Sequence, residues 1–147
     1  MINIQEMMKE LFGNSCNAYC YAYLSHKRKL VGEPSPQLLT SEVLKGWYNG
    51  HIDDDGYVSK PVQYYNSMQS SEFDWIRDVV KVPIRKLSEL PKGLWIVEYK
   101  VCPDFKESHF VVASRSGVVF DPAGDSNTVR YGAPVSYRKL VYVKEAA

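Results

Sequence analysis

Helical sequence patterns occupy the first half of this chain and strand patterns the second half. Apolar residues at helical spacing and good capping residues dominate up to about residue 70, and runs of β-branched and aromatic residues dominate from about residue 71. A chain with helices first and strands second favours an α+β fold. We therefore expect N-terminal helices (about 1–70) packed on a C-terminal antiparallel sheet (about 71–147). At 147 residues the chain has the length of a single domain with its own core.

Capping residues and glycine stops predict four helices in the first part. The first helix has Asn3 as its cap and ends at Gly13, and the second runs from Cys16, after the caps Asn14 and Ser15, to about Lys27. The third helix begins at Thr40 or Ser41, after a Gly-Glu-Pro-Ser-Pro break, and ends at Gly50. The fourth helix has Pro61 near its start. Strands are predicted at Leu94–Val101, His109–Ser114, Val118–Asp121 and Leu140–Val143.

The composition restricts the classes of partner. Basic residues number 18 and acidic residues 17, a net charge of +1, so no charge excess favours nucleic acid or an anionic membrane. The sequence shows no membrane-spanning apolar run and no secretory leader. Three cysteines, an odd number, argue against a disulfide framework and favour a reducing compartment. We expect a cytoplasmic protein that binds neither nucleic acid nor membrane and needs no metal or organic cofactor.

Cys16 is the best candidate nucleophile. It directly follows two capping residues, which places it in the first turn of a predicted helix, where the helix dipole stabilises a thiolate. The unpaired N–H groups of that turn can also hold an oxyanion. Packing in the core is the ordinary role of a free cysteine and stays open as an alternative. Cys20, one turn further on, is expected to be a core residue, and it becomes the nucleophile only if the helix starts one turn later.

His109 is the best candidate base, because a strand hairpin follows it. With a three-residue loop at 115–117, Asp121 pairs with Val111 across the hairpin. Side chains alternate along a strand, so His109 and Asp121 are then diagonal neighbours on one face. A carboxylate in that place holds an imidazole in one tautomer, as a catalytic triad requires. A two-residue turn would send Asp121 to the opposite face, so the prediction depends on the loop length.

Three motifs contain these residues: Cys16-Asn-Ala-Tyr-Cys-Tyr-Ala22, His109-Phe-Val-Val and Val119-Phe-Asp-Pro122. Their order and spacing resemble those of the papain-like cysteine peptidase superfamily. Within it, the arrangement of the motifs is most similar to that of bacteriocin-leader peptidase-like domains. The segment His109–Arg138 is also similar to an uncharacterised family of small spirochaete and phage-associated proteins. The resemblance implies a papain-like fold and a bacterial or phage thiol protease in which Cys16, His109 and Asp121 form the triad.

One position departs from the superfamily pattern, which places a glutamine about six residues before the cysteine to complete the oxyanion hole. Position 10 is Glu here, and the candidate replacements are Asn14 and Gln5. Without a replacement the oxyanion hole is incomplete. The alternative hypothesis is therefore a catalytically weak papain-like module that binds a protein partner.

Two metal hypotheses remain as minor alternatives. Cys16, Cys20, Cys102 and His109 are four potential zinc ligands, although a Cys-x-x-x-Cys pair is not the usual knuckle spacing. The segment 51–58 resembles a calcium loop but lacks the carboxylates of the first and twelfth ligand positions. A polar turn between helices is the default interpretation of that segment.

The leading hypothesis is a cysteine hydrolase that cleaves an amide or peptide bond through an acyl-enzyme. Asp121 orients His109, and His109 takes the proton of Cys16, whose sulfur attacks the carbonyl carbon. A protein processing site, a cell-wall peptide and an isopeptide-linked conjugate are all compatible substrates, and the sequence favours none of them.

Overall fold

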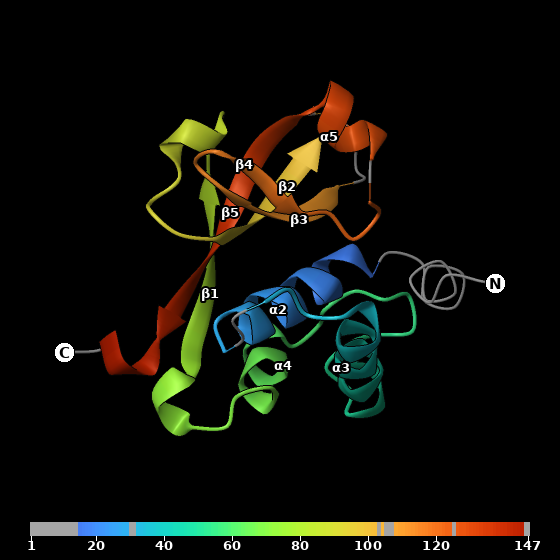
Figure 1. Ribbon diagram of the computed structural model, residues 1–147, viewed down its shortest axis with the longest axis vertical. Coiled ribbons are helices and arrows are strands. Elements are labelled where there is room, and N and C mark those ends of the chain that lie inside the picture. The colour runs from blue at the N-terminus through green and yellow to red at the C-terminus, as the bar shows by residue number, and fades with distance from the viewer. Residues whose placement is uncertain (1–14, 30–31, 103, 105–107, 125, 146–147) are drawn as a thin grey trace.

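The computed structural model describes residues 15–29, 32–102, 104, 108–124 and 126–145 (Figure 1). The expected first helix, with its cap Asn3, lies outside these residues. Three longer helices come first in the described chain: α2 (Cys16–Lys27), α3 (Pro36–Tyr48) and α4 (Pro61–Ser67). The predicted bounds of α2 are confirmed. Pro61 occupies the first turn of α4, where its missing N–H would be unpaired in any residue.

Five strands then form one antiparallel sheet in the order β1-β5-β2-β3-β4. The bounds are β1 (Ile76–Pro83), β2 (Trp95–Lys100), β3 (His109–Ser114), β4 (Gly117–Phe120) and β5 (Ala133–Tyr142), with the short helix α5 (Asn127–Tyr131) before β5 and single 3-10 turns at Glu72–Asp74, Leu87–Glu89 and Val143–Glu145. This arrangement confirms an α+β fold with N-terminal helices and a C-terminal antiparallel sheet.

Helix α2 is the central element of the molecule. It lies between the sheet and the other two long helices, α3 and α4 (Figure 1). Its tyrosines, alanines and Cys20 are buried on all sides of the helix, in a core shared with Tyr64 of α4, Ile96 of β2 and Val112 of β3. A helix that is apolar all round must be covered all round, so the position of α2 follows from its composition. A second apolar cluster includes Val97 of β2 and Tyr137 of β5 together with Leu90, which lies between β1 and β2.

The start of α3 differs from the prediction. Ser35 caps the helix, because its hydroxyl accepts a hydrogen bond from the backbone N–H of Leu38 at 3.1 Å, and Pro36 stands in the first turn. The expected opening at Thr40 or Ser41 is wrong. Thr40 lies inside the helix, where its hydroxyl is 2.8 Å from the hydroxyl of Tyr19 on α2. Proline interrupts a helix interior but suits a first turn, so the 32–36 segment leads into the helix.

Strand β1 and most of β5 are not among the predicted strands. The expected last strand, Leu140–Val143, covers only the end of β5, and Val143 already belongs to a 3-10 turn. β1 is an edge strand with five of its eight residues exposed, and charged residues interrupt its apolar positions. Pairing between β1 and β5 stabilises both strands, and this long-range contact is not visible in either local pattern.

The turn of the β3–β4 hairpin is shorter than predicted. Ser114 pairs with Gly117, so Arg115 and Ser116 form a two-residue turn instead of a three-residue loop. Gly117 has φ +146°, a value that residues with a Cβ rarely adopt. A two-residue turn alone would direct the following residues of β4 to the opposite faces of the sheet.

A register shift in β4 compensates for the short turn. The shift occurs between Val112 and Ala113 and leaves Val119 as one extra residue, a β-bulge. Phe120 consequently pairs with Val112, which is the register that a three-residue loop would produce. Asp121, the next residue, therefore follows a strand in the predicted register. The bulge at Val119 produces this register, and not the three-residue loop that was expected.

No helix in the described part of the chain combines the length and apolarity needed to cross a bilayer.

Gly46 allows α3 to pack closely on its neighbours. A Cβ at this position would lie 2.6 Å from Cε1 of Tyr64 and 2.7 Å from Cδ1 of Ile52, both buried. We predict that Gly46→Ala lowers the free energy of unfolding by about 1–3 kcal/mol through overpacking. Urea denaturation measures the change, with Gly32→Ala as control, since a Cβ at Gly32 meets no atom within 4 Å. Equal effects of the two substitutions would contradict the close contact at Gly46.

Candidate active site

Three ends of secondary-structure elements meet at one place. Cys16 is the first residue of α2, His109 is the first residue of β3, and Asp121 directly follows β4. Because β3 and β4 are antiparallel neighbours, the first residue of β3 and the last residue of β4 lie at the same end of the hairpin. The N-terminal end of α2 lies next to that end of the hairpin (Figure 1). The structure thus brings together the three residues that the sequence singled out.

The imidazole of His109 interacts with both Asp121 and Cys16. Its Nε2 lies 2.6 Å from Oδ1 of Asp121, and both side chains are largely buried. The side chain of Cys16 also acts on the ring, because it lies near enough to raise the pKa of His109. Since Nε2 faces Asp121, Nδ1 is the nitrogen left for the sulfur. This is the order of groups in a nucleophile–base–acid triad.

The surroundings of His109 favour its protonated form. Burial lowers the pKa of His109, but the hydrogen bonds to Asp121 and Cys16 and the negative charges of these two partners outweigh burial and raise the pKa from 6.5 to about 9. At neutral pH the ring is therefore an imidazolium between a carboxylate and a sulfur.

Asp121 remains ionised in this setting. Burial raises its pKa, yet hydrogen bonds from His109, from the backbone N–H of Ala123 and from the side chain of Ser126, together with the charge of His109, lower it below 3.8. The Ala123 N–H lies 2.9 Å from Oδ1, the same oxygen that faces His109. The carboxylate is thus fixed by the backbone of its own turn, Asp121–Gly124, as well as by its partner.

Ser126 is a residue of the site that the sequence reasoning did not select. Its side chain helps to lower the pKa of Asp121 and also caps α5 by accepting from the backbone N–H of Val129 at 3.3 Å. One hydroxyl therefore joins the start of α5 to the acid of the triad. The available sequence signal was a serine followed by Asn-Thr-Val, a pattern typical of a helix N-cap.

The first turn of α2 supplies donors beside Cys16. The first described hydrogen bond along the helix runs from the N–H of Tyr19 to the carbonyl of Ser15 at 3.1 Å, and the hydroxyl of Ser15 makes no capping hydrogen bond. Backbone N–H groups of this first turn have no partner within the helix and point out of its end. The two residues expected to add a side-chain donor to the oxyanion hole, Asn14 and Gln5, lie outside the described residues.

The other two cysteines stand in different environments. Cys20 is fully buried, and this burial, with the nearby charges of Cys16 and Asp121 adding to it, raises the pKa of its thiol well above 9. It is therefore placed as a core residue and is poorly suited to be the alternative nucleophile. Cys102 is partly exposed, in the segment after β2. All three thiols are free.

The metal hypotheses find no geometric support. Within the described ranges, no group of three or more His, Cys, Asp or Glu side chains is arranged to hold a metal ion. The four potential zinc ligands are therefore not assembled. In the 51–58 segment, Oδ1 of Asp53 accepts hydrogen bonds from the N–H groups of Asp55 and Tyr57, both at 3.0 Å, so this carboxylate stabilises a turn between α3 and α4.

Comparison with known proteins gives no match: no protein-family model, no curated protein and no solved structure matches this sequence. The function of the site therefore has to follow from its residues and their geometry.

The raised pKa of His109 predicts that stability depends on pH. The folded state holds this proton more tightly than the unfolded chain, so the stabilisation is complete below pH 6.5 and is lost as the pH rises to about 9. Urea unfolding across this range should show a falling free energy of unfolding for the natural protein. His109→Gln should flatten that part of the profile. Identical slopes in the two proteins would contradict the assignment.

The double role of Ser126 predicts two effects of Ser126→Ala. The pKa of Asp121 should rise, because one of the hydrogen bonds that stabilise its carboxylate is lost. The free energy of unfolding should fall by about 1 kcal/mol through loss of the α5 cap. Carbon-13 NMR titration of the carboxyl group and urea denaturation measure the two effects. Ser126→Thr keeps the hydroxyl and is the control; an unchanged Asp121 pKa in the alanine variant would exclude the contact.

Proposed function

We propose that this protein is a cysteine hydrolase of the papain-like type that cleaves an amide or peptide bond. The observation that carries the proposal is one imidazole, His109, which is hydrogen-bonded to Asp121 and lies near enough to Cys16 for that side chain to raise its pKa. The position of Cys16 as the first residue of α2 also supports the proposal, because a helix N-terminus favours negative charge on the sulfur and on the oxyanion. The order Cys, His, Asp along the chain agrees with the family resemblance.

The chemistry follows from the three side chains. The Cys16 sulfur, having given its proton to His109, attacks the substrate carbonyl carbon, and a carbon–sulfur bond forms while the carbonyl π pair moves to oxygen. The carbon–nitrogen bond then breaks, and the His109 imidazolium gives its proton to the leaving amine. An acyl thioester remains on Cys16. Neutral His109 takes a proton from water, the resulting hydroxide attacks the thioester, and the acid and the thiolate are released with the proton again on His109.

Asp121 and the first turn of α2 assist without exchanging protons. The carboxylate of Asp121 fixes the ring so that the other nitrogen is directed at the sulfur, and it stabilises the positive charge of the imidazolium. The backbone N–H of Cys16 is a donor for the oxyanion that forms in each tetrahedral intermediate. A second donor from Asn14 or Gln5 is part of the proposal, as the family pattern implies.

The proposed substrate is a peptide or protein, and the proposed compartment is the cytoplasm. Three free thiols support a reducing environment. The near balance of acidic and basic residues offers no general attraction for nucleic acid.

The order of alkylation of the three thiols tests the proposal. If exposure alone controlled the reaction, partly exposed Cys102 would react with iodoacetamide before Cys16, which is 8% exposed. A thiolate paired with an imidazolium reverses this order, so we predict that Cys16 is modified first at neutral pH. Peptide mapping by mass spectrometry after short exposures gives the order. Cys20 should remain unmodified in the folded protein because it is fully buried.

Two variants make the alkylation experiment decisive. His109→Ala removes the partner of the sulfur, and Cys102 should then react before Cys16. Cys102→Ser is the control, and it should leave the rate at Cys16 unchanged. Slow modification of Cys16 in the natural protein, no faster than that of Cys102, would reject the hydrolase and leave a papain-like binding module as the explanation of the site.

A further inference from the structure

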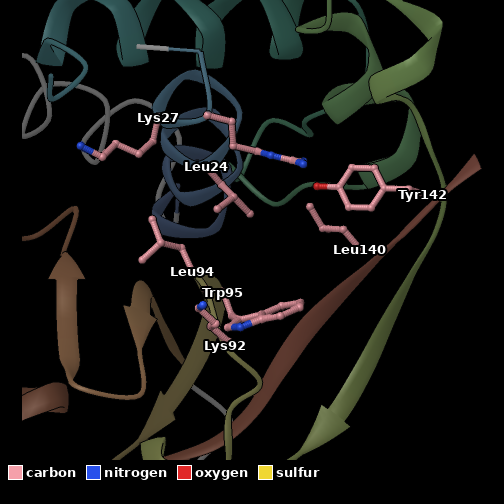
Figure 2. A pocket seen from close by; sticks show the side chains of 9 residues that line it. Leu24, Lys27, Lys92, Leu94, Trp95, Leu140 and Tyr142 are labelled. Atoms are coloured by element: carbon pink, nitrogen blue, oxygen red, sulfur yellow. The ribbon is translucent and has the colours of Figure 1, made fainter. Parts of the chain in front are cut away.

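A pocket of about 460 Å³, drawn in Figure 2, is lined by Leu24, Lys27 and Arg28 at the C-terminal end of α2, whose first residue is Cys16. Its wall on the helix side comes from the last turn of α2, and the facing wall comes from the start of β2 and the end of β5. The helix has 12 residues, so its two ends are roughly 18 Å apart. This volume falls within the range of small-molecule sites, about 300–1,000 Å³.

The floor of the pocket is apolar and fixed in position. Leu24 of α2 faces Leu94 and Trp95 across the hollow, and Leu140 of β5 closes one side (Figure 2). The indole of Trp95 is held in two ways. Its Nε1 donates a hydrogen bond to the carbonyl of Pro91 at 2.9 Å, and its ring packs edge-on against the ring of Tyr137, with centroids 5.2 Å apart. A wall whose polar group already has a partner offers only apolar surface to a ligand.

The rim of the pocket carries one sign of charge. Lys27, Arg28 and Lys92 line it, and none of the lining residues is acidic, although the whole chain is nearly neutral. The helix dipole explains cations at the C-terminal end of α2, where Lys27 is the last residue and Arg28 is the C-cap. Lys92 comes from the turn before β2 and has no such explanation.

Two of the three cations, Lys27 and Arg28, already contact other side chains. Lys27 pairs with Glu33 at 2.9 Å, but that carboxylate is 65% exposed, so water weakens the pair. Arg28 donates to the hydroxyl of Tyr65 at 3.0 Å and lies 4.6 Å from the ring centroid of Tyr142, which fixes the guanidinium beside the pocket with further N–H groups to donate. The ligand that complements this site has an apolar body and one anionic end.

We propose that the pocket binds a medium-chain fatty carboxylate. The alkyl chain packs on Leu24, Leu94 and Trp95, and the carboxylate lies at the rim between Arg28 and Lys92. A single carboxylate fits better than a polar or multiply charged group, because the floor presents apolar side chains. This inference is independent of the proposed hydrolase, and its failure would leave that proposal unchanged.

Matched ligands separate the contributions of the chain and the charge. Decanoate, decanol and acetate are titrated into the full-length protein below their aggregation limits, and binding is followed through leucine methyl resonances. We expect decanoate to saturate and to shift the methyl groups of Leu24, Leu94 and Leu140. Decanol, which lacks the charge, should bind roughly tenfold more weakly, and acetate should not bind measurably.

A charge reversal then tests the rim. Lys92→Glu should weaken decanoate binding by roughly tenfold or more and leave decanol binding unchanged, whereas Lys60→Glu, the same change outside the pocket, should alter neither. Both lysines are exposed, so both variants should fold, which the amide spectrum checks. Equal affinities for decanoate and decanol, shifts at methyl groups outside the pocket, or no saturable binding of decanoate would each overturn the proposal.

Discussion

The contact between His109 and Asp121 is the interaction on which the arrangement of the site depends. A buried imidazole without a partner would lose its proton, because burial disfavours the charged form. The carboxylate at 2.6 Å and the sulfur on the other side reverse this preference, and the pKa of His109 reaches about 9. The same contact decides which nitrogen faces Cys16. Charge, tautomer and direction of the ring therefore have one common origin, and the proposed chemistry needs all three.

The backbone makes that contact possible through a compensation between two irregularities. The two-residue turn at Arg115–Ser116 would place Asp121 out of phase with His109, and the extra residue Val119 restores the phase. The same shift sets Phe120 against Tyr23 of α2, where the two rings are stacked with centroids 4.3 Å apart. A single register thus holds the acid of the triad in place and packs the hairpin on the helix that carries the nucleophile.

The sequence predicted what depends on local patterns. The bounds of α2 were predicted from the residue types at its ends and its apolar residues, although Ser15 makes no capping hydrogen bond. The order of helices and strands indicated the α+β class. β1, most of β5 and the role of Ser126 depend on contacts between distant segments, which local periodicity does not contain. The hairpin shows the difference most clearly: its register was predicted, but from a loop length that the chain does not have. Gly117 resembles a loop residue in the sequence although it pairs with Ser114, and the bulge at Val119 leaves no mark in the apolar run Val118-Val119-Phe120.

The distance between the sulfur of Cys16 and the imidazole of His109 tests the central claim most directly. An X-ray structure of the unmodified protein at neutral pH measures it. We predict that Sγ lies within about 4 Å of Nδ1, with Nε2 still bonded to Asp121, because proton transfer requires hydrogen-bond reach. A separation of more than about 8 Å, with no hinge able to close it, would rule out the triad.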